Sequence, residues 1–378
     1  MNIQAFDKPV YVTKPFLPPI EEYAAGLRGI WDAAWLTNGG PVLERFRRAL
    51  EETLDHRNLC LCVNGTLALQ IALKGLRLEG EVITTPFTFV ATAHAAAWNG
   101  LRPVFADIEP DHYTLDPAAV EAAITPDTSA ILAVHVFGHP CRTQELADVA
   151  RRHGLKLIYD AAHAFGVRAD GRSIAHFGDV SVFSFHATKP FHSIEGGLLA
   201  FADPGLKETY SQLKNFGIVS ESEIAGLGTN AKMNEFQALM GLTVLPHLPA
   251  VVAARAQVAR IYRERLAGVP GLHLPPPLPP HCVPNHAYQP IEIDGDEAGC
   301  DRNAAYEGLK KHNVFARRYF HPLLTACAPY RNAKTGGDCP VAQRVAQRIL
   351  TLPIHHDLAP DSVHRICDVL LHLLSGSA

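Results

Sequence analysis

Short apolar segments alternate with helical segments through the first half of the chain, and no other feature constrains the fold as strongly. The apolar segments are rich in β-branched residues, and their apolar residues do not alternate with polar ones. This pattern is typical of strands buried on both faces of a parallel sheet. The segments expected as strands are 59–63, 81–85, 102–108, 128–138, 155–163, 179–185 and 196–201. The segments expected as helices are 41–55, 65–76, 87–100, 116–124 and 142–154. The pattern predicts an α/β fold with a mostly parallel, mixed sheet between helices.

A second, smaller unit is expected after residue 245, where the composition changes. Its expected elements are a helix over 247–268, a proline-rich connector over 275–280, a strand over 287–293, and helices over 300–313 and 361–374. Proline repeats of this kind adopt stiff, extended conformations. We therefore expect a large domain over residues 1–245 and a smaller α+β C-terminal domain over residues 246–378.

Composition argues against several classes of protein. The chain has 378 residues and a formal net charge of -4, so neither nucleic acid nor an anionic membrane is expected as its main partner. No apolar run approaches the roughly 20 residues that span a bilayer. The N-terminus also shows no apolar core of a secretory signal. A cytoplasmic location is expected by default.

Cysteine and histidine spacing gives no sign of a metal site. The eight cysteines form no CxxC pair. Free thiols are expected, because the chain shows no secretory signal. The adjacent His355 and His356 lack the i, i+4 spacing of a helical zinc site, so no metal is expected. No G-x-G-x-x-G motif follows a first strand and no P-loop motif occurs, so the sheet is expected to serve another kind of ligand.

Polar and aromatic residues follow the ends of the predicted strands, where open α/β sheets bind ligands. The segment "NGT" (64–66) opens a helix whose free N–H groups suit a phosphate, although an ordinary helix cap has the same composition. Phe89 could lie flat on a ligand ring or pack in the core. Asp160 ends an apolar strand, where a carboxylate needs a salt bridge, a helix to cap, or the protonated ring nitrogen of a cofactor.

Lys189 lies in "SFHATKPFHSIEGG" (184–197), between a predicted strand and two glycines. Lysine amines become nucleophiles and form Schiff bases when desolvation or nearby cations lower their pKa. Gly196 and Gly197 allow the backbone to approach closely. A lone lysine is usually a solvated surface charge. Together with the phosphate turn, the aromatic platform and Asp160, Lys189 indicates a pyridoxal phosphate site.

These segments resemble the DegT-type sugar-nucleotide aminotransferases, a branch of the type I fold of pyridoxal-phosphate enzymes, over essentially the whole chain. The motifs that carry the resemblance are "LTNGGPV" (36–42), "VNGTLAL" (63–69), "EVITTPFTFVATAHA" (81–95), "RPVFADI" (102–108), "VHVFGHPC" (134–141), "LIYDAAHAFG" (157–166), "SFHATKPFHSIEGG" (184–197), "LKNFG" (213–217), "GTNAKMNEFQA" (228–238), "RRYFHPL" (317–323) and "LTLPIH" (350–355). The resemblance implies a pyridoxal 5'-phosphate-dependent transaminase that works as a homodimer with shared active sites.

The resemblance also implies roles for individual residues. Lys189 would form the Schiff base with the cofactor and later carry the substrate proton. Asp160 would pair with the pyridine nitrogen, and His163 would approach the ring hydroxyl. The other implied cofactor contacts are stacking by Phe89 and phosphate contacts from Gly65, Thr66, Ser184 and, from the neighbouring subunit, Asn230.

Substrate contacts are assigned to two places in the sequence. The contacts expected in "FARRYFHPL" are Arg317, Arg318, Tyr319 and His321. The guanidinium groups suit a diphosphate by their bidentate geometry, although both could be surface charges. His192 and Ser193 stand where the family has an Asn-Thr pair, and Ala231 stands where glycine is expected. We hypothesise that His192 contacts the substrate or tunes Lys189, and so changes the sugar preference.

The expected reaction moves an amino group from L-glutamate to a nucleotide-linked keto-6-deoxy sugar. The resemblance is strongest to the branch that converts dTDP-4-keto-6-deoxy-D-glucose to dTDP-4-amino-4,6-dideoxy-D-glucose. Two alternatives within the class are a 3-keto sugar nucleotide and a non-nucleotide cyclic ketone as acceptor. A different class, the pyridoxal phosphate-dependent sugar dehydratases, includes members with histidine at the position of Lys189, so the lysine argues against that class.

Overall fold

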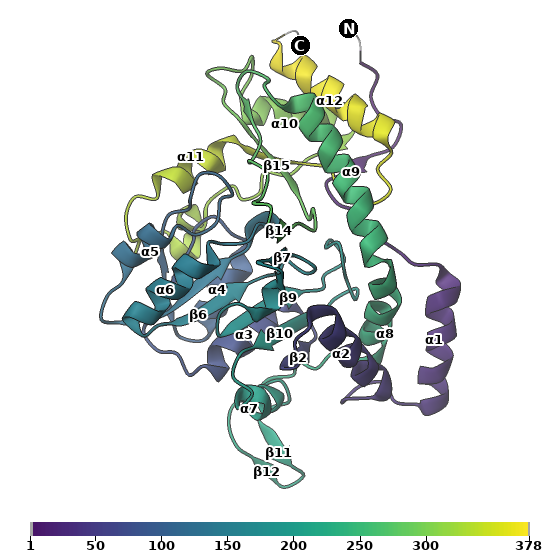
Figure 1. Cartoon of the computed structure of the whole chain (residues 1–378), viewed down its shortest axis with the longest axis vertical. Helices are drawn as coiled ribbons and strands as arrows, with labels where there is room; N and C mark the ends of the chain where they lie inside the picture. Colours follow the sequence, from purple (N-terminus) through teal and green to yellow (C-terminus); the bar gives the residue numbers. More distant parts are fainter. Residues whose placement is uncertain (1–2, 377–378) are drawn as a thin grey trace.

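The computed structural model describes residues 3–376, and its centre is a seven-stranded sheet (Figure 1). The strand order is β2 (Leu59–Cys62), β10 (Gly197–Phe201), β9 (Val180–Ser184), β6 (Lys156–Asp160), β5 (Thr128–Val134), β3 (Glu81–Thr84) and β4 (Arg102–Phe105). Only β10 runs against its neighbours, because it pairs antiparallel with both β2 and β9. The predicted mostly parallel, mixed sheet is therefore confirmed.

Helices cover both faces of this sheet, as the continuous apolar strands require. The covering helices are α2 (Pro41–Leu54), α3 (Gly65–Gly75), α4 (Val90–Trp98), α5 (Pro117–Ala123), α6 (Thr143–His153), α7 (Leu206–Leu213) and α8 (Glu235–Val244). Successive residues of a strand face opposite layers. Leu59 and Leu61 pack in the cluster that contains α2 and α8, whereas Cys60 and Cys62 pack in the cluster that contains α3.

A smaller antiparallel sheet forms beyond α9 (Leu248–Leu266), in the upper part of Figure 1. Its strands are β13 (Leu272–His273), β15 (Gln289–Ile293) and β17 (Ile349–Leu352), and the helices around it are α10 (Arg302–Lys311), α11 (Pro340–Arg348) and α12 (Pro360–Leu374). Near the start of the chain, β1 (Val10–Tyr11) pairs with β16 (Val314–Phe315). Phe6 packs in a second hydrophobic core, which is formed by α9, this smaller sheet, α10 and α12. The division into domains at residue 245 stays a prediction.

Several predicted boundaries were wrong for local reasons. The helix expected over 87–100 begins at Val90, because the Thr85 hydroxyl accepts a hydrogen bond from the Phe87 N–H at 3.0 Å and forms a turn first. The strand expected over 128–138 ends at Val134, since Phe137 has a φ of 57° that no strand accommodates. The helix α1 (Ile20–Ala33), which packs against α8, was missed, as were α8 and α11.

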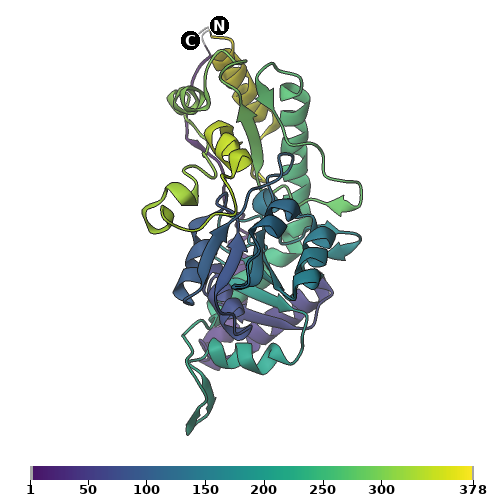
Figure 2. The same cartoon turned by 90° about the vertical axis from the view of Figure 1, so that its left-hand side faces the viewer.

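Two smaller features stand apart from the main sheets. The strands β7 (Arg168–Ala169), β8 (Arg172–Ser173) and β14 (Cys282–Val283) form a small sheet that joins the two parts of the chain. The strands β11 (Ile218–Ser220) and β12 (Glu223–Ile224) form a hairpin that projects from the body in both views (Figures 1 and 2). Every residue of these two hairpin strands is exposed.

One helical stretch corrects the expectation that no segment is long and apolar enough to cross a membrane. The stretch Glu235–Leu266, which comprises α8 and α9, meets that criterion by length and composition. Half of the most apolar part of this stretch is buried inside the protein, where α8 packs on α2 and α9 packs on α12. Core helices of soluble proteins meet the same criterion, so the stretch is weak evidence for a membrane.

Candidate active site

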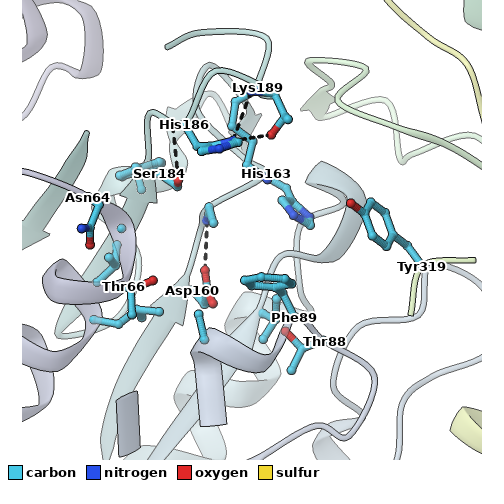
Figure 3. Close-up of a pocket in the computed structure, with 18 of the residues that line it drawn as sticks. Asn64, Thr66, Thr88, Phe89, Asp160, His163, Ser184, His186, Lys189 and Tyr319 are labelled. Carbon is cyan, nitrogen blue, oxygen red and sulfur yellow. Dashed lines mark hydrogen bonds between the residues drawn. The ribbon is translucent and has the colours of Figure 1, made fainter. Parts of the chain in front are cut away.

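A cavity of about 400 Å³ lies at the carboxyl ends of the central strands. Its walls come from the segments after β2, β3, β6 and β9, and it is closed from the other side by Tyr288, Tyr319 and Phe320 of the C-terminal part. Figure 3 shows Lys189 on one side of this cavity and Phe89 on the other. This is the edge of the sheet where the sequence predicted a ligand, and the volume suits a small molecule.

Asp160 ends β6 with its carboxylate almost fully buried. The Thr92 hydroxyl donates to Oδ2 at 2.7 Å, and the Ala162 N–H donates to Oδ1 at 3.1 Å. Burial raises the pKa of Asp160, while these two hydrogen bonds and the charge of Lys189 oppose the rise. Within residues 3–376 no cation pairs directly with this buried carboxylate, which calls for a positive partner within the cavity.

His163 follows in the same turn and is held in one neutral form. The Phe137 N–H donates to its Nδ1 at 3.1 Å. Burial, together with the nearby charge of Lys189, holds the pKa of His163 well below its usual range. Because Nδ1 accepts a hydrogen bond, the single ring proton of neutral His163 lies on Nε2, where it can be donated to a ligand.

The turn after β2 forms a cradle for an anion. Asn64 caps α3, because its side chain accepts a hydrogen bond from the Leu67 N–H at 2.8 Å. The first N–H groups of the helix lack partners within the helix, and their residues Gly65 and Thr66 line the cavity together with Ser184. A Cβ atom on Gly65 would lie 2.9 Å from the Ser184 Cβ, and one on Gly197 would lie 2.3 Å from the Asn64 carbonyl oxygen. The cradle therefore depends on glycine at both positions.

Phe89 lines the cavity and does not pack in the core. Its side chain is 58% exposed although it stands between a buried turn and helix α4. Its ring projects into the cavity near His163 (Figure 3). An aromatic ring exposed in this position offers a flat apolar surface to a planar ligand.

Lys189 reaches the cavity from a turn after β9. Its backbone N–H donates to the His186 carbonyl at 2.9 Å, which closes the turn. Its Nζ donates to the Tyr288 hydroxyl at 3.2 Å. His186 lies beside it (Figure 3), with Nδ1 2.8 Å from the Thr188 hydroxyl and Nε2 3.5 Å from Glu195. The amine is thus inside the cavity and is not a solvated surface charge.

The structure brings together most of the predicted cofactor residues. Those that line the cavity are Gly65, Thr66, Phe89, Asp160, His163, Ser184 and Lys189. Asn230 lies elsewhere on the surface, where its Oδ1 accepts a hydrogen bond from Lys232 at 2.7 Å. The role predicted for Asn230 across a dimer stays a prediction.

Of the four substrate residues predicted near the C-terminal motif, one lines the cavity and three do not. Tyr319 lines the cavity, whereas Arg317, Arg318 and His321 are not among the residues of its wall. The Arg318 guanidinium stacks 4.6 Å above the Tyr306 ring and donates to Asn303 at 3.0 Å. The contact between these arginines and a diphosphate therefore stays a prediction.

His192 is buried away from the cavity wall. Its Nε2 lies 2.7 Å from the Phe16 carbonyl oxygen, and its Nδ1 accepts from the Ile194 N–H at 3.2 Å. Both ring nitrogens are therefore used by the backbone, and burial lowers the pKa of His192. This placement gives no geometric support to the hypothesis that His192 contacts the substrate.

Sequence reasoning did not identify Thr92, which bonds to Asp160, or Tyr288, which bonds to Lys189. Thr92 lies in α4, four residues after Thr88, which precedes the helix, and the two hydroxyls are 2.9 Å apart. The i, i+4 spacing of the two threonines was a readable signal within the helix expected over 87–100. Tyr288 gave no such signal, because it lies 99 positions after Lys189 and reaches it from the C-terminal part.

Within residues 3–376, no group of three His, Cys, Asp or Glu side chains is placed to hold a metal ion. The cysteines are free thiols, as predicted, and most are buried.

Comparison with known proteins identifies the family. The sequence profile of the DegT/DnrJ/EryC1/StrS aminotransferase family matches residues 20–371. The chain is 42% identical to the dTDP-4-amino-4,6-dideoxy-D-glucose transaminase of Shigella dysenteriae over 364 residues, which are 96% of this chain and 99% of that protein. It is 41% identical to the Escherichia coli protein of the same name over 370 residues, which are 97% and 99% of the two chains.

Solved structures agree with this result. The crystal structure of DesI in the presence of its TDP-sugar product matches with a TM-score of 0.94 at 39% identity, covering 99% of this chain and 95% of that one. The structure of S. venezuelae DesV in complex with a ketimine intermediate matches with a TM-score of 0.86 at 31% identity, covering 93% and 94%. The fold is the predicted type I aminotransferase fold, and the chain belongs to the DegT/DnrJ/EryC1/StrS aminotransferase family.

Proposed function

We propose that this aminotransferase binds pyridoxal 5'-phosphate and moves an amino group from L-glutamate to a nucleotide-linked keto sugar in the cytoplasm. The observation that carries the proposal is that Lys189 and Asp160 face one cavity, which is also lined by the N-terminus of helix α3. The names of the relatives support dTDP-4-keto-6-deoxy-D-glucose as the acceptor and dTDP-4-amino-4,6-dideoxy-D-glucose as the product.

The residues of the cavity fit this cofactor by their chemistry. Asp160 offers a buried carboxylate to a protonated ring nitrogen, which would remove the cost of an unpaired buried charge. The exposed ring of Phe89 offers a stacking surface. The α3 N-terminus, with Gly65 and Ser184, suits a phosphate. When bound, pyridoxal phosphate supplies an electron sink that stabilises negative charge on the substrate carbon.

The protein's own groups then orient the reactants and move protons. Lys189 Nζ lies in the cavity beside the Tyr288 hydroxyl, and there it takes the α-proton from the amino donor and returns a proton to the carbon that receives the amine. The Nε2 proton of His163 is available to hold a ring oxygen in place. Tyr319 and Phe320 cover the mouth with apolar surface, which limits the access of water.

A homodimer with shared sites belongs to the same proposal. The β11–β12 hairpin exposes Ile224 at 72%, and nearby Leu227 is 85% exposed. An isolated two-stranded hairpin is only marginally stable in water, so a projecting one is best explained by a partner surface. The position of Asn230, close to this hairpin and away from its own cavity, is consistent with a contact to the neighbouring site.

A mixing experiment tests the shared sites. Lys189→Ala and Asn230→Ala subunits would each be impaired at limiting cofactor. A mixed dimer contains one site with both residues intact, so mixing should restore activity to up to about a quarter of all sites. Ultracentrifugation should show a dimer. A monomer, or no recovery on mixing, would rule out shared sites.

The main test combines purified protein, pyridoxal phosphate, L-glutamate and dTDP-4-keto-6-deoxyglucose, with mass spectrometry of the sugar. We expect an amino sugar that disappears in Lys189→Ala. The matched control is Lys156→Ala, which removes a surface lysine paired with Asp179 at 2.8 Å and should keep full activity. If glutamate bleaches the visible band of the bound cofactor but no amino sugar forms, the acceptor is wrong, and 3-keto sugar nucleotides and cyclic ketones would be assayed next. If the protein binds no cofactor, the proposed function fails.

A further inference from the structure

Tyr288 is the polar neighbour of the lysine amine. The Lys189 Nζ lies 3.2 Å from the Tyr288 hydroxyl and 5.5 Å from the centre of its ring. The same ring packs 4.8 Å from the ring of His163, so one side chain touches two residues of the site. Tyr288 is buried, with 7% of its surface exposed.

The chain segment before Tyr288 is fixed to the main sheet by side-chain hydrogen bonds. The Asn285 amide nitrogen donates to the carbonyl oxygens of His163 at 2.8 Å and Phe165 at 3.0 Å. The Asn285 Oδ1 accepts from the Ala287 N–H at 3.0 Å, which holds the segment in a turn. The turn that carries His163 and the turn that carries Tyr288 are therefore joined directly.

A second anchor comes from the helix behind this segment. Arg255 in α9 is only 1% exposed, and its Nη1 donates to the carbonyl oxygens of His286 at 3.2 Å and Ala287 at 3.1 Å. After Tyr288 the chain enters β15, which pairs with β17. Because the segment is held on both sides, the place of the Tyr288 hydroxyl is built into the fold and does not depend on a mobile loop.

A phenol can hold an amine in either protonation state. Its oxygen accepts a hydrogen bond from an ammonium group, and its O–H donates to the lone pair of a neutral amine. A lysine side chain has four rotatable bonds, so an amine without a partner would sample many positions. A proton carrier acts efficiently only when it stays within hydrogen-bond reach of the reacting atom.

We propose that Tyr288 is a positioning residue that holds Lys189 Nζ in the cavity whenever the amine is not bonded to the cofactor. This role rests on the proposed function, because it concerns the lysine expected to bond pyridoxal phosphate. It extends that function by giving the C-terminal part of the chain a direct contact with the amine that moves the proton. Docking of this part against the main sheet therefore also places the amine.

The test uses Tyr288→Phe, which keeps the ring against His163 and removes only the hydroxyl. The rate at which the apoprotein captures pyridoxal phosphate covalently would be followed by absorbance. The affinity for pyridoxamine phosphate, which cannot bond to the lysine, would be measured in parallel. We expect capture to slow about tenfold, as for the loss of one hydrogen bond to a charged group, with the affinity for pyridoxamine phosphate unchanged.

Tyr262→Phe is the matched control. It removes another buried tyrosine hydroxyl, which donates to the Pro353 carbonyl at 2.9 Å in the second core and does not line the cavity. Both variants are expected to lower the melting temperature slightly, but only Tyr288→Phe should slow capture. With glutamate deuterated at the α-carbon, Tyr288→Phe should also show a larger isotope effect on kcat, because proton transfer becomes more limiting.

The two measurements together show whether the Tyr288 hydroxyl acts on Lys189 or on the cofactor. Unchanged capture in Tyr288→Phe would overturn the proposal. A parallel loss of pyridoxamine phosphate affinity would also overturn it, since the hydroxyl would then act on the cofactor ring and not on Lys189. If the unmodified protein binds pyridoxamine phosphate but captures no pyridoxal phosphate, Lys189 is not held for bonding and this role is refuted alone. If it binds neither compound, the proposed function is refuted as well.

Discussion

Replacing Asp160 with asparagine separates the charge of this site from its shape. The side chain is 5% exposed, and both carboxylate oxygens accept hydrogen bonds, from Thr92 at 2.7 Å and Ala162 at 3.1 Å. An asparagine can keep both contacts. Its oxygen accepts from Ala162, and its amide donates to Thr92, whose hydroxyl can turn to donate to Thr88 at 2.9 Å. The change therefore removes a charge without leaving a cavity or an unpaired group.

We expect Asp160→Asn to weaken cofactor binding but to stabilise the apoprotein. In the form with cofactor, the carboxylate would face a ring nitrogen with a positive charge. Removing one partner of a buried pair costs about 3–5 kcal/mol, so the affinity for pyridoxal phosphate should fall roughly a hundred- to several-thousand-fold. Activity should fall at least as far, because an unprotonated ring is a poor electron sink. In the apoprotein the carboxylate has no such partner, so Asp160→Asn should raise the melting temperature at pH 8.

The dependence on pH gives a further check on the apoprotein. Burial raises the pKa of Asp160, so its protonated form favours the folded state. That stabilisation is complete below the unfolded pKa of about 4 and is lost as the pH rises through the folded pKa. The gap in melting temperature between Asp160→Asn and the unmodified apoprotein should therefore widen from pH 4 towards neutrality. An apoprotein variant that melts lower at pH 8, or a variant that keeps its cofactor affinity, would refute the reasoning.

Four other changes test single contacts. Phe89→Ala should weaken cofactor binding by about 1 kcal/mol, measured by equilibrium titration, with little change in stability because the ring is 58% exposed. Gly197→Ala should lower the free energy of unfolding by about 1–3 kcal/mol in denaturant titrations, because a Cβ would lie 2.3 Å from the Asn64 carbonyl oxygen. His192→Asn should lower stability by about 1–3 kcal/mol, since the bond to Phe16 at 2.7 Å is lost; a changed sugar preference without loss of stability would instead favour the hypothesis drawn from the sequence. Asn230→Ala should weaken cofactor binding in the dimer, and unchanged affinity would sink its assigned role.

The central sheet and its ligand edge were predictable because their causes are local. A strand buried on both faces must be apolar throughout, so β5 and β6 stand out in the sequence. Parallel strands place their carboxyl ends at one edge, so Asp160 and the turn at Asn64 were expected to meet. The start of α4 was not predictable in the same way. Its periodicity extends back through Phe87, but the hydrogen bond from the Phe87 N–H to Thr85 forms a turn there, and the helix starts only at Val90.

Residues from the far end of the chain were harder to place, because docking and not local pattern decides where they lie. Arg317 and Arg318 had the chemistry for a diphosphate, yet Arg318 is held by Asn303 outside the cavity wall. Tyr288 had no distinguishing pattern, yet it lies against Lys189 because Asn285 bonds to the turn of His163. Both outcomes depend on hydrogen bonds between segments more than ten residues apart, which the periodicity of a sequence does not encode. The residues that align Lys189 are therefore best sought among the bonds that join the C-terminal part to the sheet, and Asn285→Ala should reproduce the slow capture of pyridoxal phosphate expected for Tyr288→Phe.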